Sequence, residues 1–385
     1  MTAKFEGALN LSEPDRLICR VLRGEKFPWP HQEDRGLEQA FLSRSQYYGV
    51  QALLHEQLAN ARDWPREILE TIRRNTIRDA MWELRHRLVI ETVLESLAEI
   101  GVQPVLFKGT ALAYSLYASP ALRTRGDTDL IIPAESRSDV EAALVRLGLT
   151  RDFSISGEYI SYQASYVSRP KSGGTHGLDL HWKISNSELL SRLFSYDELR
   201  ESATPLPALS ARALATDLPH ALLIACMHRG LHRQVPYYID GVAHLGGNRL
   251  IWIYDIHLLA CAMSELQWKT FLKLAVQKSL CAPCLKCLED SKLCFRTSVP
   301  EYVRRALGQS TSRDALGCYF DAGQMKRQWL DFRAIGTASC RIGFLRELLF
   351  PPPDYMRHKY NQASFRWLPW LYVRRVCAGF AKVVG

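Results

Sequence analysis

The segment Val105-Leu106-Phe107-Lys108-Gly109-Thr110, followed by Arg123-Thr124-Arg125-Gly126-Asp127-Thr128-Asp129-Leu130-Ile131-Ile132, decides the fold of this chain. The apolar residues 103–107 predict a buried strand, Gly109 breaks it, and residues 110–117 predict a helix with an apolar side. A second strand carries the two aspartates and continues through the apolar residues 130–132. Further on, Leu178-Asp179-Leu180-His181-Trp182 predicts a third strand with alternating faces.

The acidic residues of these strands are the first candidate site. Side chains at i and i+2 of a strand share a face, so Asp127 and Asp129 are expected to point the same way. Asp179 supplies a third carboxylate, on the face opposite Leu178 and Leu180. Like charges repel, and Mg²⁺ relieves this repulsion because it binds one or two carboxylates together with phosphate oxygens. We therefore expect three converging carboxylates, although an Asp-x-Asp pair alone is also typical of a solvated turn.

The turn after the first strand is the second candidate. A glycine at a strand-to-helix turn lets backbone N–H groups, here of Gly109 and Thr110, approach a phosphate. Lys108 adds a positive charge at the rim, and a lysine that closes a buried strand is costly unless an anionic group meets it. Arg123 has two interpretations: a phosphate contact, or a structural partner of a carboxylate.

The order of these pieces is more specific than any one of them. On Lys108-Gly109, Arg123, Asp127-x-Asp129 and Asp179, and more weakly through His220 and His228 to Asp255, the chain resembles the uncharacterised nucleotidyltransferase family of the DNA polymerase beta-like nucleotidyltransferase superfamily. The resemblance implies an α+β fold with a small mixed β-sheet core embedded between N-terminal and C-terminal helical regions. Typical superfamily members carry a Gly-Ser pair where Lys108-Gly109-Thr110 stands here.

The resemblance also implies chemistry. Two divalent metals, Mg²⁺ or Mn²⁺, would be held by Asp127, Asp129 and Asp179, and a nucleoside monophosphate would be transferred from an NTP such as ATP. Asp179 would accept the proton of the attacking hydroxyl. Charge on the triphosphate would be neutralised by Lys108, Arg123 and the N–H groups of Gly109 and Thr110.

Three further residues are candidate contacts to the acceptor or the nucleotide: His181, His228 and Asp255. His228 is alternatively an ordinary polar residue, or a metal ligand together with His232. Asp255 lies among apolar residues, so it must be paired, face a cleft or cap a helix.

The length and the hydropathy pattern of the chain predict how it divides into regions. We expect a helical N-terminal region over residues 1–100, the nucleotidyltransferase core over 101–186, a helical domain over 187–320 and a basic, aromatic-rich tail over 321–385. Within the first region, residues 37–59 and 65–100 carry helical apolar spacing. Met1 to Pro14 does not resemble a signal peptide, and no apolar run is long enough to span a bilayer, so a cytoplasmic location is predicted.

The cysteines offer a separate hypothesis. Cys281, Cys284, Cys287 and Cys294 form a C-x2-C-x2-C-x6-C run, which is reminiscent of iron–sulfur or zinc ligation but fits neither standard spacing. Leucines at helical spacing surround the run. A buried amphipathic helix is therefore the expected structure.

The charge is concentrated at the C-terminal end. Residues 326–385 hold eleven Lys and Arg against three Asp and Glu, in a chain whose formal net charge is +9. Aromatic residues interleave with them over 364–384, so this segment predicts an amphipathic helix with a cationic face. One interpretation is that this helix contacts an anionic membrane surface, RNA or a partner. The other, which we expect, is that it packs its aromatic side on the core.

Two classes of function remain open from the sequence. The first is an active nucleotidyltransferase that acts on a small molecule, a peptide or protein, or a tRNA. The second is a catalytically degenerate relative that binds a nucleotide or a partner. The three acidic positions and Lys108-Gly109 favour the first class, because binding alone has no chemical need for three carboxylates. A nucleic-acid-binding module would depend only on the basic tail.

Overall fold

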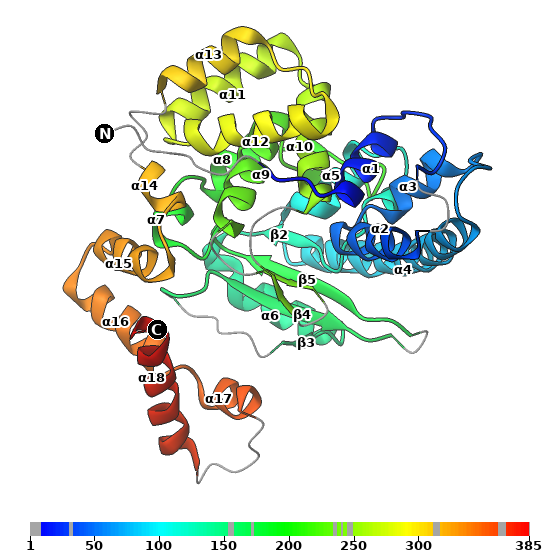
Figure 1. Cartoon of the computed structure of the whole chain (residues 1–385). Helices are drawn as coiled ribbons and strands as arrows, with labels where there is room; N and C mark the ends of the chain where they lie inside the picture. The colour runs from blue at the N-terminus through cyan, green and yellow to red at the C-terminus, as the bar shows by residue number, and fades with distance from the viewer. Residues whose placement is uncertain are drawn as a thin grey trace.

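The structure is a computed structural model that describes residues 9–30, 34–152, 158–170, 173–233, 237–239, 242–244, 249–310, 316–360 and 367–384. Within these residues, seven short strands form one mixed sheet with the order β3-β4-β5-β2-β1-β7-β6. Helices pack on the two faces of the sheet, with α6 behind β4 and β5 and α9 above them in Figure 1. The expected α+β class, with a mixed sheet between helical regions, is therefore confirmed.

The strands of the sheet are short. Their bounds are β1 Val105–Phe107, β2 Asp129–Ile131, β3 Thr150–Arg151, β4 Gln163–Ser168, β5 His176–His181, β6 Thr204–Pro205 and β7 Leu214–Ala215. The central pairs are β1 antiparallel to β2, and β2 parallel to β5. Apolar residues over 159–167 and the Gly-rich turn over 169–177 predict a hairpin with the strand that carries Asp179, and β4 and β5 do pair antiparallel. β6 and β7 join the sheet from beyond residue 186, and the domain boundaries expected at residues 100, 186 and 320 stay predictions.

Helices cover both faces of the sheet because successive strand residues point to opposite sides. Leu106, Leu130 and Leu180 pack on one face against α4 (Arg66–Glu99) and α6 (Arg137–Arg146). Phe107 and Ile131 pack on the other face against α9 (Leu218–His232). The short elements between these strands and helices are α5 Lys108–Ser115, η1 Pro120–Leu122 and η2 Ala134–Ser136.

The N-terminal helices form a second layer beside the sheet. They are α1 Glu13–Leu22, α2 Arg35–Tyr48 and α3 Gln51–Leu58, and they pack on the first half of α4 through Ile68 and Ile72. The apolar pattern over residues 37–59 is split into α2 and α3, because Gly49 ends α2 with a left-handed φ of 67°. The same apolar cluster includes Leu250 and Ile253. This cluster therefore joins the N-terminal helices to the helix that carries Leu250 and Ile253.

The C-terminal region is also helical. Its elements up to residue 320 are α7 Glu188–Ser191, α8 Tyr196–Glu201, α10 Leu250–Ala262, α11 Glu265–Gln277, α12 Cys281–Phe295, α13 Glu301–Ser310 and α14 Gly317–Phe320, with the strand pair β8 Tyr237–Ile239 and β9 Val242–His244. The tail consists of α15 Gln324–Ala334, α16 Ala338–Leu349, α17 Pro353–Lys359 and α18 Leu368–Val384. Among the described helices, none is both long and apolar enough to cross a membrane.

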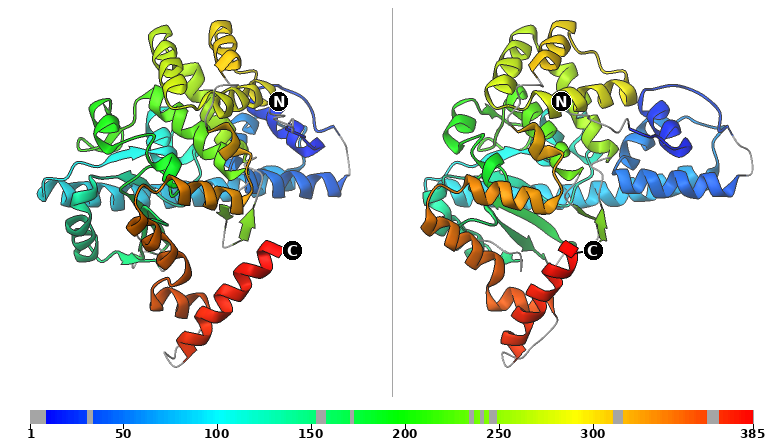
Figure 2. Two further views of the ribbon diagram at one scale, coloured as in Figure 1. Left: turned by 90° about the vertical axis from the view of Figure 1, so that its left-hand side faces the viewer. Right: turned by 60° about the vertical axis from the view of Figure 1, so that its left-hand side comes forward.

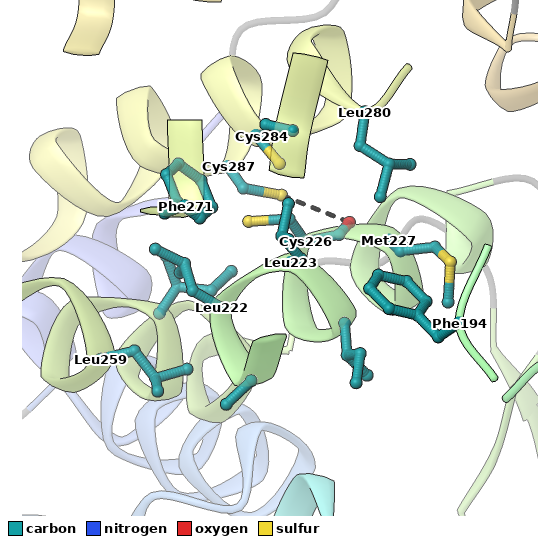
Figure 3. Packing of buried hydrophobic residues seen from close by; sticks show 14 of the residues in the cluster. Phe194, Leu222, Leu223, Cys226, Met227, Leu259, Phe271, Leu280, Cys284 and Cys287 are labelled. Carbon is teal, nitrogen blue, oxygen red and sulfur yellow. Dashed lines mark hydrogen bonds between the residues drawn. The ribbon is translucent and has the colours of Figure 1, made fainter. Parts of the chain in front are cut away.

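The cysteine run lies in the core of this region. Cys281, Cys284, Cys287 and Cys294 are all buried on α12. The first three belong to the apolar cluster that includes α9, where Cys284 and Cys287 lie beside Cys226 (Figure 3), and Cys294 belongs to the cluster of the N-terminal helices. The Cys287 thiol donates to the backbone carbonyl of Cys226 at 3.7 Å, and burial raises the pKa of the Cys226 thiol well above its ordinary range. The expected buried helix is therefore confirmed, because all four cysteines of the run are buried on α12.

Candidate active site

The parallel pairing of β2 and β5 sets the acidic residues side by side. Asp129 lies opposite Asp179 in this register, and Ile131 lies opposite His181. Alternation then places Asp129, Asp179 and His181 on the same face of the sheet. One ligand atom from each of the three lies within 4.8 Å of the others, which is close enough for one metal ion. Carboxylate oxygens are the donors that Mg²⁺ and Mn²⁺ prefer, so this set fits such an ion.

Asp127 lies just before β2, at the rim of this group. Its side chain is exposed, and its carboxylate is not one of the three grouped ligands. Strand β5 runs close to the backbone that carries Asp127. A Cβ on Gly177 would lie only 3.0 Å from the Gly126 carbonyl oxygen and 3.3 Å from the Asp127 Cβ. Glycine at residue 177 therefore allows β5 to come close to the segment that carries Asp127. The convergence of all three carboxylates on one metal stays a prediction.

The three carboxyl groups differ in their pKa values. Burial and the charges of Asp127 and Asp129 raise the pKa of Asp179 to about 7. Desolvation and the charge of Asp129 likewise raise the pKa of Asp127. Burial would also raise that of Asp129, but the Lys108 ammonium and a hydrogen bond from His181 outweigh it and lower the pKa. The site therefore concentrates negative charge that a cation would relieve.

Lys108 forms the positive side of the site. Its Nζ donates to Asp129 Oδ1 at 2.7 Å, and His181 Nε2 lies 3.0 Å from the same oxygen. Lys108 itself adopts a left-handed φ of 58° between β1 and α5. The sequence analysis did not indicate this left-handed conformation of Lys108. Strain of this kind costs about 1–3 kcal/mol and is typical of functional sites.

Gly109 and Thr110 lie in the first turn of α5. A Cβ on Gly109 would meet Arg125 and Arg123 side-chain atoms at ordinary distances of 3.5 and 3.7 Å. The Thr110 hydroxyl is buried: it accepts from Arg125 Nε at 2.8 Å and lies 2.7 Å from the Thr128 hydroxyl. The Thr110 side chain thus belongs to the framework, and only its backbone N–H is a candidate for a phosphate.

Arg123 pairs with Asp255, which lies in the middle of α10. Its Nε and Nη2 donate to the two carboxylate oxygens at 2.9 and 2.7 Å, and the Tyr117 hydroxyl donates to Asp255 at 2.7 Å. Both charged side chains are less than a tenth exposed. Of the alternatives left open by the sequence, the geometry therefore favours a structural partner for Arg123 and a paired, non-capping role for Asp255.

A polar network beneath the site escaped the sequence analysis. Arg125 Nη2 bonds Glu83 of α4 at 2.8 Å, and both side chains are buried. His86, also on α4, lies 2.7 Å from the Thr128 hydroxyl between the two aspartates. The network fixes the Arg123–Asp129 segment against α4. In the sequence, this network is indicated only by Glu83 and His86, two polar residues on the apolar side of the helix predicted over residues 65–100.

Strand β4 also contributes residues that the sequence did not indicate. Ser165 lies opposite Asp179, and its hydroxyl donates to Asp179 Oδ1 at 2.6 Å. Gln163 Nε2 donates to Asp179 Oδ2 at 3.2 Å. Such contacts orient a metal-binding carboxylate. The sequence indicates only that Gln163 and Ser165 share one face of a strand, because they are two residues apart.

His228 lies on α9 with a half-buried ring. The ring packs edge-on against Trp252 at 4.8 Å and against His232 at 4.5 Å. Burial, the neighbouring His232 and the charge of Lys108 lower its pKa well below the ordinary range. The ring is therefore neutral and packed, and a contact to substrate stays a prediction.

A cavity of about 180 Å³ lies between α4 and the Arg123–Arg125 segment. Its lining consists of Arg78, Asp79, Trp82, Glu83, Ala121, Arg123, Thr124 and Arg125. The cavity thus borders the framework network, and the grouped residues Asp129, Asp179 and His181 do not line it.

Comparisons with known proteins bear on this arrangement. No curated protein sequence matches the chain. Among solved structures, the antibiotic-resistance factor ANT(2'')-Ia is similar at 13% sequence identity and a TM-score of 0.32, with 49% of this chain and 89% of that chain covered. A family model described as "Uncharacterised nucleotidyltransferase" matches residues 37–296, well over half of the chain and all of the site. The chain therefore belongs to this family of nucleotidyltransferases.

Proposed function

We propose that the chain transfers a nucleoside monophosphate from an NTP to a hydroxyl or similar group of an acceptor, which is a small molecule, a peptide or protein, or a tRNA. The observation that carries the proposal is the group of Asp129, Asp179 and His181 at paired positions of two parallel strands, with Lys108 beside it. Family membership supports the same class of reaction.

The donor set supports divalent metal binding. We propose Asp127, Asp129 and Asp179 as the ligands, with His181 beside Asp129 within the same group of side chains. Bound Mg²⁺ or Mn²⁺ would neutralise charge on the triphosphate and lower the pKa of the acceptor hydroxyl. The structure supports this assignment because the carboxylates are crowded and the pKa of Asp179 is raised to about 7 by burial and by Asp127 and Asp129.

The residues of the chain then have distinct roles. Asp179 accepts the proton of the attacking hydroxyl, which the bound metal would make more acidic. Lys108 neutralises the triphosphate, and the N–H groups of Gly109 and Thr110 bind its oxygens at the start of α5. Arg123 acts through Asp255 as a positioning residue: it holds the segment that carries Asp127.

One observation favours the alternative, a catalytically degenerate protein that binds a nucleotide or a partner. Lys108 Nζ and His181 Nε2 both contact Asp129 Oδ1, so this carboxylate is already neutralised within the protein. In an active enzyme, Lys108 must turn from Asp129 to the triphosphate when substrate binds. In a degenerate protein it stays in place.

The label position in the NTP separates the two. The purified chain is incubated with each NTP, Mg²⁺ or Mn²⁺ and fractionated cell extract, with the ³²P label at the α- or the γ-phosphate. Nucleotidyl transfer moves the α-label to an acceptor and leaves the γ-label in pyrophosphate. Nucleotide binding without α-transfer supports the degenerate alternative, and γ-transfer contradicts the proposal, because it identifies a kinase-type reaction.

The variants are Asp129→Asn and Asp179→Asn, with Asp139→Asn as the matched control. Asp139 is an exposed carboxylate on α6, outside the site. Each site variant is expected to lower α-transfer by at least about a hundredfold, because it removes a charge-stabilising ligand. The control is expected to keep full transfer. Equal rates in all three variants would contradict the assignment of the site.

A further inference from the structure

The C-terminal helices expose large apolar side chains. Figures 1 and 2 place α17 and α18 at the periphery, beyond α15 and α16. Among the described residues between 325 and 373, nine large apolar residues are exposed: Met325, Trp329, Ile342, Leu345, Leu349, Phe350, Trp367, Trp370 and Val373. Trp367 and Trp370 are 56% and 52% exposed. The expectation that the tail packs its aromatic side on the core is therefore wrong for these two residues, while Phe365 lies outside the described residues.

The inner face of α18 is fixed, which explains why the aromatic residues point outward. Leu371 is fully buried, and the Tyr372 hydroxyl donates to the Pro351 carbonyl at 2.7 Å. Arg375 donates to the Leu348 carbonyl at the end of α16. Given 3.6 residues per turn, Trp370, Val373 and Cys377 then share the side of the helix that faces away from these contacts.

A basic residue accompanies each apolar stripe. On α18, Arg374 is exposed and its guanidinium lies 5.5 Å from the centre of the Trp370 ring. On α16, Ile342, Leu345 and Leu349 are exposed at helical spacing, with exposed Arg346 between them. The last sixty residues carry eleven basic and three acidic residues, so nearly all of the net charge of +9 belongs to the tail.

We propose that this tail surface, defined by the exposed apolar residues of α16 and α18 with Arg346 and Arg374, docks on the surface of an anionic lipid bilayer. Tryptophan side chains prefer the interface between headgroups and acyl chains, aliphatic side chains enter it, and arginines bind anionic headgroups. Docking at the surface needs no membrane-spanning helix, in keeping with the described helices.

Other occupants fit the surface less well. A second copy of the chain would bring two strongly positive tails together, which repel. RNA would complement the charge and stack on tryptophan, but it offers nothing to exposed Ile342, Leu345 and Val373, because stacking uses aromatic faces. The mixture of aliphatic, tryptophan and basic side chains is the composition of an interfacial helix.

The test is flotation of the full-length protein with lipid vesicles at about 0.15 M salt. One set of vesicles is phosphatidylcholine alone, and in the other about a third of the lipid is phosphatidylglycerol. We expect binding to the anionic vesicles at least roughly tenfold stronger than to the neutral ones. No binding to anionic vesicles, or equal binding to both, would overturn the proposal.

Matched variants separate the tail from the rest of the surface. The double substitution Trp367→Ser/Trp370→Ser is expected to weaken partitioning roughly tenfold or more, and Arg374→Gln about fivefold. The controls Leu266→Ser and Lys269→Gln change an exposed leucine and an exposed lysine on α11 and should bind as the natural chain does. Circular dichroism checks that each variant is folded.

A labelled RNA tests the competing occupant. If RNA binds tightly and Arg374→Gln weakens it, while the tryptophan variant binds vesicles as well as the natural chain does, the surface serves nucleic acid and the membrane proposal is overturned. If both tail variants bind vesicles more weakly and both α11 controls bind as the natural chain does, the result supports the membrane proposal.

Discussion

The buried pair of Arg123 and Asp255 offers a sharp test of how the site is held. It joins the segment before β2 to α10, 132 residues further along the chain. Substitution Asp255→Ala leaves a guanidinium, itself only 7% exposed, without its carboxylate. Loss of one partner of a buried ion pair costs about 3–5 kcal/mol, so we expect the free energy of unfolding to fall by about 4 kcal/mol. Asp255→Asn keeps an acceptor oxygen for Arg123 and Tyr117, and should cost about 2 kcal/mol.

The measurement is urea unfolding followed by circular dichroism, with the double variant Arg123→Met/Asp255→Leu as the decisive comparison. Two apolar side chains of similar volume remove both charges, so this variant should recover most of the lost stability. If Arg123 is only a positioning residue, the double variant also keeps NTP affinity within a few-fold. A stable double variant that loses NTP binding would refute the structural role and show that the guanidinium contacts the triphosphate. A cost below about 1 kcal/mol for Asp255→Ala would refute the energetic argument.

Three further predictions concern the site. The pKa of Asp179 is raised from 3.8 to about 7 by burial and by the charges of Asp127 and Asp129, so its contribution to stability is present at low pH and is lost as the pH rises through about 7. The melting temperature in EDTA should therefore fall between about pH 4 and 7, and the stabilisation by Mg²⁺ should grow over the same range; a metal effect that shrinks with rising pH would contradict this. Because Lys108 has a φ of 58°, Lys108→Gly should be roughly 0.5–1 kcal/mol more stable in urea than Lys108→Ala, and equal stability would show that the turn is unstrained. Ser165→Ala removes the hydrogen bond that orients Asp179 and should weaken Mn²⁺ binding about tenfold by calorimetry, whereas Ser138→Ala, on the exposed side of α6, should not.

The local elements of this fold follow closely from the sequence. The β4–β5 hairpin, the helix α4 and the buried cysteine helix α12 were all predicted, because their apolar periodicity is set by residues a few positions apart. Two local details were missed. Gly49 divides one predicted helix into α2 and α3, and Lys108 takes a left-handed conformation that the sequence did not indicate. In both cases the difference is a single backbone angle, to which side-chain periodicity is insensitive.

The sequence alone determined the family resemblance, the α+β class and the face of the third predicted strand that carries Asp179, because strand alternation and motif order are properties of neighbouring residues. The tertiary structure decided which groups meet. The register between β2 and β5 brought His181 to Asp129, the register between β4 and β5 brought Ser165 to Asp179, and α10 supplied the partner of Arg123. The tertiary structure also decided that Trp367 and Trp370 point outward, because the opposite side of α18 contacts α16. Such pairings join residues tens to more than a hundred positions apart, and the local pattern of apolar and polar residues carries no record of them.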